Sequence, residues 1–389
     1  MSNGEVKSGH WVSLTGAALA AVVVGFASTI LVVMQAADAV GATPAQKASW
    51  AAILCFAMGA ITLFLSWRHK MPMIIAWSTP GAALMATSKG LNYEAALGAF
   101  AFAGALMVAT GLIKPLARMI ENIPAAIASA MLAGVLVGYV LKVPGSAVAA
   151  PWLVVPLIFA FFAMRLWKPI YAVPLVVVLG LALAGMQGGL GQGCCDLSIT
   201  RLTFNVPQFQ WQILLSLGLP LYLVTMASQN LPGFAVMRSH GYAPPVSSAL
   251  IATGLCSALM SPFGGPQVNM AAITASMAMG HDVHPNQAER WKVSIPYFVL
   301  YVAVGLAASF FVVVLGALPH DLIIAIAGLA LFGPLMGGMT AMMHAPKDIE
   351  AGLVTFLVTA SGFSIFSIGA AFWGLLAGLL LWGVKKAIQ

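Results

Sequence analysis

Charged residues are scarce in this chain. Asp, Glu, Lys and Arg together make up 7% of its 389 residues, whereas hydrophobic residues make up 61% and the mean hydropathy is +0.98. Because soluble domains carry about 25% charged residues, the composition excludes a soluble domain of ordinary size. The chain is therefore predicted to be an all-α polytopic membrane protein.

Cysteine and metal ligands are also sparse. Of the four cysteines, Cys55 and Cys256 lie inside apolar runs, and Cys194 and Cys195 are adjacent, a spacing that suits neither a disulfide framework nor a zinc site. The sequence has no metal-spaced His/Cys/Glu set, no glycine-rich nucleotide loop and no helical His-Glu pair. We therefore expect no metal, no cofactor and no enzymatic activity. The 17 basic residues form no clustered face, which argues against nucleic-acid binding.

Long apolar runs are what the chain has in abundance. A run of about 17–25 residues is long enough to cross roughly 30 Å of hydrocarbon as a helix. Fourteen such spans are predicted, and they are 13–37, 44–66, 70–88, 91–118, 123–142, 150–165, 169–187, 209–236, 244–261, 262–280, 290–317, 319–342, 349–362 and 368–385.

The loops between these spans differ in charge. With both termini in the cytoplasm, thirteen of the 17 Lys and Arg residues fall in cytoplasmic loops, and four, Lys47, Lys89, Lys142 and Arg201, fall outside. Because Lys and Arg concentrate in cytoplasmic loops, this bias favours an even number of spans with both termini cytoplasmic. The N-terminal segment lacks the residue order of a cleaved signal peptide, so the first span is expected to be retained.

Two parts of the chain resemble each other. The stretch "GATPAQKASWAAILC" from Gly41 matches "GYAPPVSSALIATGLC" from Gly241, and "PGAALMATSKG" from Pro80 lies over "NMAAITASMAMG" from Asn269. The halves are therefore predicted to be repeats of seven spans. Because seven is odd, the second copy enters the membrane from the opposite side, which makes the repeats inverted.

The third and tenth predicted spans both begin with residues that cannot start a regular helix. "PMIIAWSTPG" from Pro72 and "PFGGPQVN" from Pro262 are punctuated by proline and glycine, so each span is predicted to be a short extended strand followed by a half-helix. A helix that starts midway across the bilayer presents unpaired N–H groups and a partial positive charge, which can hold an anion. We expect the two half-helix N-termini to face each other at the bilayer midplane and to hold the substrate between them, the alternative being two kinks packed between neighbouring helices.

The stretches "ASQNLPGFAVMRSHGY" (227–242) and "FGGPQVNMAAITAS" (263–276) resemble the benzoate:proton symporter family, the BenE-type benzoate membrane transport proteins, and the resemblance covers essentially the whole chain. It implies a fold similar to uracil permease and the sulfate permeases, with a core domain (13–122 and 208–318) and a gate domain (123–190 and 319–386). It also implies proton-coupled uptake of benzoate across the bacterial inner membrane by alternating access. The oligomeric state stays open, a homodimer included.

The sequence departs from the nucleobase transporters of this fold at two positions. Those relatives place glutamates where this chain has Gln229 and Pro266. A carboxylate there would repel benzoate, whereas an amide and a proline do not. The residue types thus favour an aromatic acid over a nucleobase.

Candidate substrate contacts lie at the two breaks and on the flanking spans one and eight. The groups able to donate to a carboxylate belong to Ser78, Thr79 and Gly81 at the first break, Gly265, Gln267 and Asn269 at the second, and Ser28, Thr29, Gln229 and Asn230 on the flanking spans. Trp77, Tyr222 and Phe263 are candidates for apolar faces around the ring, the alternative being ordinary packing.

The sequence indicates less about proton coupling than about the substrate site. All ten acidic residues lie at span ends or in loops, and Asp38 is the candidate for a proton relay. Two alternatives stay open, namely a proton carried on the substrate as benzoic acid and a water network beside Gln229. Other functions also stay open: a passive channel for small anions, a transporter of another organic anion or nucleobase on the same fold, and an intramembrane enzyme or scaffold.

Overall fold

The structure is a computed structural model that describes residues 3–87, 91–113, 115, 124–186, 199–271, 273–281, 283–365 and 368–388. Within these residues, eight helices are long and apolar enough to cross a membrane, and a bent helix pair makes a ninth. The prediction of a polytopic helical membrane protein is therefore confirmed. The total of fourteen spans stays a prediction.

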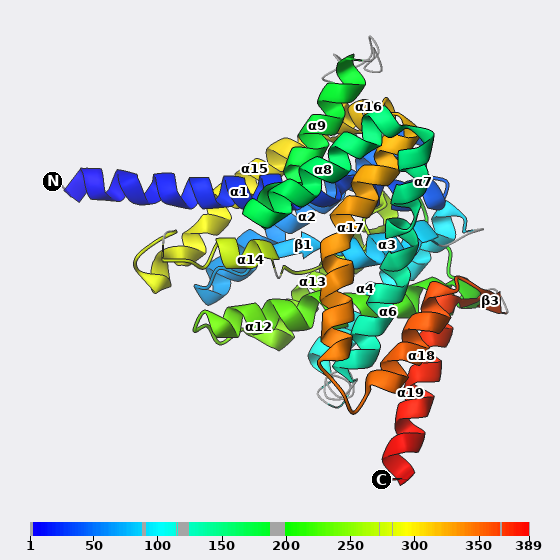
Figure 1. The fold of residues 1–389 in the computed structure, drawn as a ribbon. Coiled ribbons are helices and arrows are strands. Elements are labelled where there is room, and N and C mark those ends of the chain that lie inside the picture. The colour runs from blue at the N-terminus through cyan, green and yellow to red at the C-terminus, as the bar shows by residue number, and fades with distance from the viewer. Residues whose placement is uncertain are drawn as a thin grey trace.

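Helices dominate both halves of the chain (Figure 1). The first half contains α1 (Asn3–Ala39), α2 (Pro44–His69), β1 (Ile75–Trp77), α3 (Thr79–Thr87), α4 (Tyr93–Leu112), α6 (Ala125–Val140), α7 (Lys142–Ala149), α8 (Pro151–Trp167), η1 (Pro169–Tyr171) and α9 (Ala172–Met186). The second half contains α10 (Trp211–Ile213), η3 (Leu214–Gly218), α11 (Leu219–Thr225), η4 (Met226–Asn230), α12 (Leu231–Ser239), α13 (Val246–Met260), η5 (Ser261–Phe263), β2 (Val268–Met270), α14 (Ile273–Met277), η6 (Gln287–Val293), α15 (Ser294–Leu306), α16 (Ala308–Gly316), α17 (His320–Met343), α18 (Ile349–Ala360), β3 (Ser364–Ile365), β4 (Ile368–Gly369) and α19 (Ala370–Ile388).

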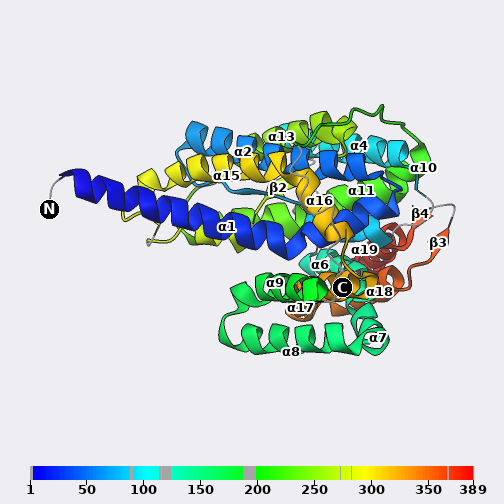
Figure 2. The same cartoon turned by 90° about the horizontal axis from the view of Figure 1, so that it is seen from above.

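These elements form two groups that Figure 2 separates clearly. The larger group contains α1 to α4 and α10 to α16 with β1 and β2, and the smaller group contains α6 to α9 and α17 to α19. Helix α6 contacts both α3 and η4, and α1 contacts α9 and α17. The two groups therefore meet along α1, α3 and η4 on one side and α6, α9 and α17 on the other.

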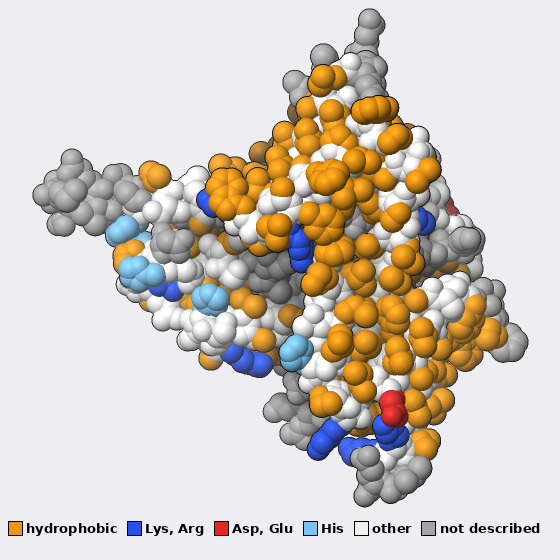
Figure 3. Space-filling view, viewed as in Figure 1, with side chains coloured by type: hydrophobic (Ala, Val, Ile, Leu, Met, Phe, Trp, Pro, Cys, Tyr) orange, Lys and Arg blue, Asp and Glu red, His pale blue; other side chains and the backbone are white. Residues whose placement is uncertain are grey.

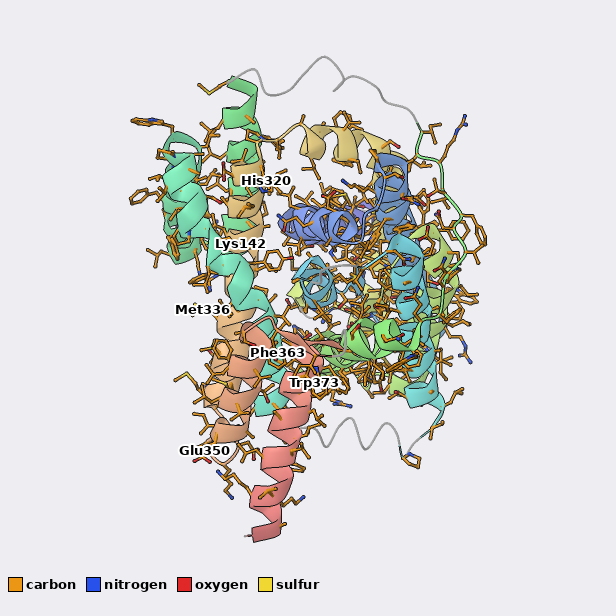
Figure 4. The ribbon with its side chains drawn as sticks, turned by 90° about the vertical axis from the view of Figure 1, so that its right-hand side faces the viewer. Lys142, His320, Met336, Glu350, Phe363 and Trp373 are labelled. Atoms are coloured by element: carbon orange, nitrogen blue, oxygen red, sulfur yellow. The ribbon has the colours of Figure 1, made fainter. Side chains whose placement is uncertain are left out.

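The surface of the smaller group is largely apolar (Figure 3). Charged side chains gather near its C-terminal end, where Lys385 pairs with Glu350 at 2.7 Å and Lys386 lies 4.9 Å from the centre of the Trp382 ring. Figure 4 shows Glu350 near one end of this group and His320 toward the other. An apolar flank with charged and aromatic residues at its end fits helices that cross a bilayer.

The centre of the larger group is a crossing of two short strands. β1 and β2 pair in antiparallel fashion, with Ile75 opposite Met270, Ala76 opposite Asn269 and Trp77 opposite Val268. The predicted break of the third and tenth spans into a strand and a helix is confirmed. Buried backbone groups outside a helix need other partners, and the pairing of the two strands supplies them.

Side chains of neighbouring helices complete these hydrogen bonds. The N–H of Ile75 donates to Oγ1 of Thr62 on α2 at 3.0 Å, and the N–H of Val268 donates to Oγ of Ser257 on α13 at 3.0 Å. The hydroxyl of Tyr297 on α15 donates to the Ile75 carbonyl at 2.8 Å. The strand crossing is thus held by the side-chain hydroxyls of residues on otherwise apolar helices.

The second half-helix is shorter than predicted. A helix was expected to continue to residue 280, but α14 covers only Ile273–Met277 and turns follow it. The buried guanidinium of Arg290 takes up two nearby carbonyls, donating to Met279 at 2.7 Å and to His284 at 2.8 Å. These bonds hold the chain in a turn where the helix would have continued.

The eleventh predicted span is bent, because another segment enters its hydrogen-bond ladder. The helical stretches Gln287–Leu306 and Ala308–Gly316 meet at 56°. At the bend, the N–H of Thr200 donates to the Leu306 carbonyl at 3.0 Å, and Oγ1 of Thr200 accepts from the Ser309 N–H at 2.8 Å. Insertion of a side chain into the ladder is a known cause of helix kinks.

The hydroxyls behind the strands should matter more for stability than hydroxyls that bond within their own helix. Thr62→Val should lower the free energy of unfolding by about 1–3 kcal/mol, because it leaves the buried Ile75 N–H unpaired. Thr355→Val is the matched control, since the buried Thr355 hydroxyl donates to Ala351 of its own helix at 2.8 Å. Melting in detergent checks this, and equal losses in both variants would contradict the role of Thr62.

Candidate functional site

Ser78 fixes the point where α3 begins. Its N–H donates to the Gln267 carbonyl at 3.0 Å, and its Oγ accepts from the Gly81 N–H at 3.2 Å. The same Oγ shares a hydrogen bond of 2.8 Å with Oγ1 of Thr225 on α11. Ser78 therefore caps α3 and fastens it to β2 and α11, which leaves its side chain committed to the fold.

Thr79 is the first residue of α3 and is half-buried. Its hydroxyl forms no hydrogen bond with another described residue, and the next residue, Pro80, carries no N–H. The N-terminal end of a helix carries a partial positive charge. Thr79 thus places an available hydroxyl at the positive end of a nine-residue helix.

The eighth predicted span contains two π-helical turns, η3 and η4. Each is followed by a helix whose second residue is proline, Pro220 in α11 and Pro232 in α12. A wider turn before proline relieves the clash of its ring with the preceding turn. Turns of this kind recur at functional sites, and η4 carries two of the predicted site residues.

Those two neighbours, Gln229 and Asn230, have different environments. Asn230 is fully buried, and its Oδ1 accepts from the Met270 N–H of β2 at 3.0 Å. Gln229 is half-buried, and its amide forms no hydrogen bond within the part of the chain that is described. Asn230 therefore supports the strand crossing, whereas Gln229 is available to a ligand.

Gln267 and Asn269 are fully buried beside the strands. Nε2 of Gln267 donates to the Phe100 carbonyl at 2.9 Å. The Asn269 amide, with its oxygen turned toward Ser78, accepts from the Ser78 N–H at 3.1 Å and donates to the Met270 carbonyl at 3.1 Å. Of these two amides, both predicted as substrate contacts, Asn269 serves the backbone of the break, whereas Gln267 ties the start of β2 to α4 and its Oε1 has no partner among the described residues.

An aromatic cluster lies beside β1. Nε1 of Trp77 donates to Oγ1 of Thr29 at 2.7 Å, which orients the indole. The Trp77 ring centre lies 5.7 Å from that of Phe26, which lies 4.8 Å from that of Phe311. Phe26 and Phe311 were not predicted from the sequence as site residues. The position of Phe26, one helical turn before Thr29, is the signal that was available.

The other two predicted aromatic contacts, Tyr222 and Phe263, are engaged by other side chains. The buried Tyr222 hydroxyl shares a hydrogen bond of 2.5 Å with Oγ1 of Thr110, between α11 and α4. Phe263 lines an apolar groove of about 450 Å³ between α2 and α13, and its ring centre is 5.7 Å from that of Phe204. Both side chains therefore have partners other than the residues of the strand crossing.

The predicted glycines mark close approaches between elements. A Cβ on Gly81 would lie 2.5 Å from Cδ1 of Leu221, and a Cβ on Gly265 would lie 2.9 Å from Sδ of Met260. Gly81 thus lets α3 pack against α11, and Gly265 lets the tenth span pack against α13.

For two further predicted residues, Ser28 and Asp38, the structure gives no contact with the other described site residues. Ser28 lies on α1, but its side chain is outside the described residues. Asp38, at the end of α1, forms an ion pair with Lys47, and its side chain is 57% exposed. Its role as a proton relay stays a prediction. Among the described residues, no group of three or more His, Cys, Asp and Glu is placed to hold a metal ion.

The sequence matches known membrane transport proteins over almost its full length. The family described as "Benzoate membrane transport protein" matches residues 10–384. The chain is 38% identical to "Inner membrane protein YdcO" of Escherichia coli (strain K12) over 369 residues, covering 95% of this chain and 94% of that protein. It is 30% identical to the "Benzoate membrane transport protein" of Acinetobacter baylyi over 376 residues, covering 96% and 95%.

Solved structures share the fold at low sequence identity. The transmembrane domain of the cyanobacterial bicarbonate transporter BicA matches with a TM-score of 0.59 at 14% identity, over 97% of this chain and 98% of that one. The murine anion transporter Slc26a9, in its inward-facing state, matches with a TM-score of 0.62 at 12% identity, over 97% and 68%.

The two neighbours in η4 should respond differently to truncation. Asn230→Ala should lower the free energy of unfolding by about 1–3 kcal/mol, because it leaves the Met270 N–H without its partner. Gln229→Ala should change it by less than about 0.5 kcal/mol, since no protein hydrogen bond is lost. Melting of both variants in detergent checks the difference. A Gln229→Ala loss as large as that of Asn230→Ala would show that Gln229 is a packing residue.

Proposed function

We propose that this chain, which belongs to the benzoate membrane transport family, takes up benzoate or a closely related aromatic carboxylate together with a proton. The observation that carries the proposal is the strand crossing that starts α3 in the middle of the larger group, where α3 and η4 both contact α6. A site there lies between the two groups of helices and is therefore suited to alternating access.

The chemistry around Thr79 suits a carboxylate. The positive end of α3, the Thr79 hydroxyl and the Gln229 amide offer attraction and donors without a basic side chain. The helix α14, with five residues, is too short to match α3, so the proposal places the carboxylate at the start of α3 and across from β2. The solved structures of similar fold are named as a bicarbonate transporter and an anion transporter, which supports an anionic substrate.

The apolar part of the substrate needs a different surface. Phe26, Trp77 and Phe311 form adjoining aromatic faces, and the Trp77 indole is held in place by Thr29. Offset or tilted stacking of aromatic rings is favourable. A benzene ring that packs against this cluster leaves its carboxylate free to turn toward Thr79, which supports an aromatic acid over a small inorganic anion.

We further propose fourteen spans in two inverted repeats. The candidate spans reach this number when the two strand-broken segments and the three shorter apolar helices, α8, α9 and α18, are counted. The packing also supports the symmetry. In the two proposed repeats α2 corresponds to α13, and α4 corresponds to α15. The contact of α2 with α15 is therefore repeated by the contact of α13 with α4. Thr62 of α2 and Ser257 of α13 then serve equivalent strands.

In this scheme, residues 13–122 and 208–318 form the core domain and residues 123–190 and 319–386 form the gate. Alternating access is then a movement of the core domain against the gate domain, with α6 of the gate domain in contact with α3 and η4 of the core domain. The charge bias of the loops supports cytoplasmic termini in a bacterial inner membrane, where the Escherichia coli relative is named.

The membrane potential supports coupling to a proton. An anion that moves inward against a negative-inside potential is opposed by about 2.3 kcal/mol per 100 mV. One proton per benzoate makes the cycle electroneutral, and the pH gradient then drives uptake. A passive anion channel would instead expel benzoate at such a potential.

Purified protein in proteoliposomes should show saturable benzoate uptake that follows an inward pH gradient. Undissociated benzoic acid also crosses bare lipid along this gradient, so the measurement is the saturable initial rate above that of protein-free vesicles at neutral external pH. Gln229→Glu should lower that rate at least about tenfold, because it adds like charge to the site. Collapsing the potential alone should change the wild-type rate little.

Benzamide, which lacks the carboxylate, should compete poorly with benzoate. A rate that follows the potential and ignores the pH gradient would contradict proton coupling. Benzamide that competes as well as benzoate would remove the carboxylate from the recognised features.

A further inference from the structure

Four buried polar atoms without a partner gather in one part of the larger group. Among the described residues, Nε1 of Trp50, the hydroxyl of Tyr93, Oγ1 of Thr203 and Oε1 of Gln267 are inaccessible to solvent and have no hydrogen-bond partner. Native proteins pair about 90% or more of such groups, with protein or with ordered water. A concentration of unpaired groups in one place therefore calls for a ligand that can pair them.

Three of the four side chains are joined through shared neighbours. The Trp50 ring centre lies 6.4 Å from that of Tyr93 and 5.4 Å from that of Phe100. Gln267 reaches the same place, because its Nε2 donates to the Phe100 carbonyl at 2.9 Å. Its Oε1 is left as an unpaired acceptor, and the residue lies two positions before Asn269 of the strand crossing.

Gly264 packs closely against the Tyr93 hydroxyl and Trp50. Its φ is +97°, a conformation that favours glycine, and a Cβ there would lie 2.6 Å from the Tyr93 oxygen and 3.2 Å from Cβ of Trp50. Any side chain at this position would therefore crowd the hydroxyl.

The fourth atom connects this place to the surface. Thr203 belongs to the segment 199–210, which crosses the ends of α2 and α4 and carries mostly exposed residues. The Thr203 N–H donates to Oγ of Ser49, the neighbour of Trp50, at 3.0 Å. The Gln208 N–H donates to the carbonyl of Glu94, the neighbour of Tyr93, at 2.9 Å. The segment thus lies directly over Trp50 and Tyr93.

We propose that Thr203, Trp50, Tyr93 and Gln267 line a file of water molecules that conducts protons between the surface under segment 199–210 and the strand crossing. The proposal rests on the proton-coupled function proposed above. Each group contributes what a water file needs: Trp50 donates, Gln267 accepts, and the two hydroxyls do both. A buried water with two to four such partners is a stable part of a protein.

Proton movement along this file needs no ionised side chain. At each step one oxygen accepts a proton while it releases another to its neighbour, so one O–H bond forms as one breaks and every group ends as it began. The proton that leaves the file at Gln267 accompanies the carboxylate at the crossing. This explains how coupling works in a chain whose ten acidic residues all lie at span ends or in loops.

The test compares two tyrosines whose buried hydroxyls both lack a partner among the described residues. Tyr93 lies in the proposed file, and Tyr139 lies on α6 of the smaller group, with exposed fractions of 4% and 5%. Proteoliposomes carrying Tyr93→Phe or Tyr139→Phe are assayed for pH-driven benzoate uptake and for benzoate exchange at equal pH. Exchange proceeds without net proton release, so it reports binding and movement without the file.

Tyr93→Phe should lower pH-driven uptake at least about tenfold, with exchange within about twofold of wild type, and Tyr139→Phe should leave both rates unchanged. Thr203→Val repeats the test at the half-buried outer end, where folding is less at risk. Wild-type pH-driven uptake in both Tyr93→Phe and Thr203→Val would overturn the proposal, and so would equal loss of uptake and exchange. If wild-type protein itself shows exchange without pH-driven uptake, the proposed proton coupling fails, and the file fails with it.

Discussion

The structure depends on the antiparallel pairing of β1 with β2 in the interior of a membrane protein. Proline and glycine end the helices there, and the freed N–H and C=O groups have no water to turn to. They pair with each other and with hydroxyls and amides from four helical elements, Thr62 of α2, Ser257 of α13, Tyr297 of α15 and Asn230 of η4. This network fixes where α3 starts, and with it the position of a partial positive charge.

The same network explains why few polar residues are left for a substrate. Ser78, Asn230 and Asn269 are fully or almost fully buried and hold the strand crossing in place, and the buried Gln267 donates to α4. Thr79 and Gln229 are half-buried and carry no such duty. The proposed site, with two available donors and a helix end, would suit a substrate with one carboxylate. It also avoids a buried cation, which would hold an anion too tightly to release it.

Part of this arrangement was legible in the sequence. Both breaks were predicted from the prolines Pro72, Pro80, Pro262 and Pro266 and the glycines beside them, because the backbone preferences of proline and glycine are local. The register of β1 on β2 was not predictable, since it joins residues almost 200 positions apart. The different roles of Gln229 and Asn230 were not predictable either, because they depend on which of the two side chains faces β2. The short α14 depends on Arg290, whose carbonyl partners are set by the turn itself.

The most direct test of the account is a structure of the protein with benzoate bound, determined by cryo-electron microscopy in a lipid nanodisc. The account predicts the carboxylate within hydrogen-bonding distance, about 3 Å, of Thr79 at the start of α3, with the ring against Trp77 and Phe26. Benzoate bound in the apolar groove between α2 and α13, or anywhere else away from the strand crossing, would contradict it.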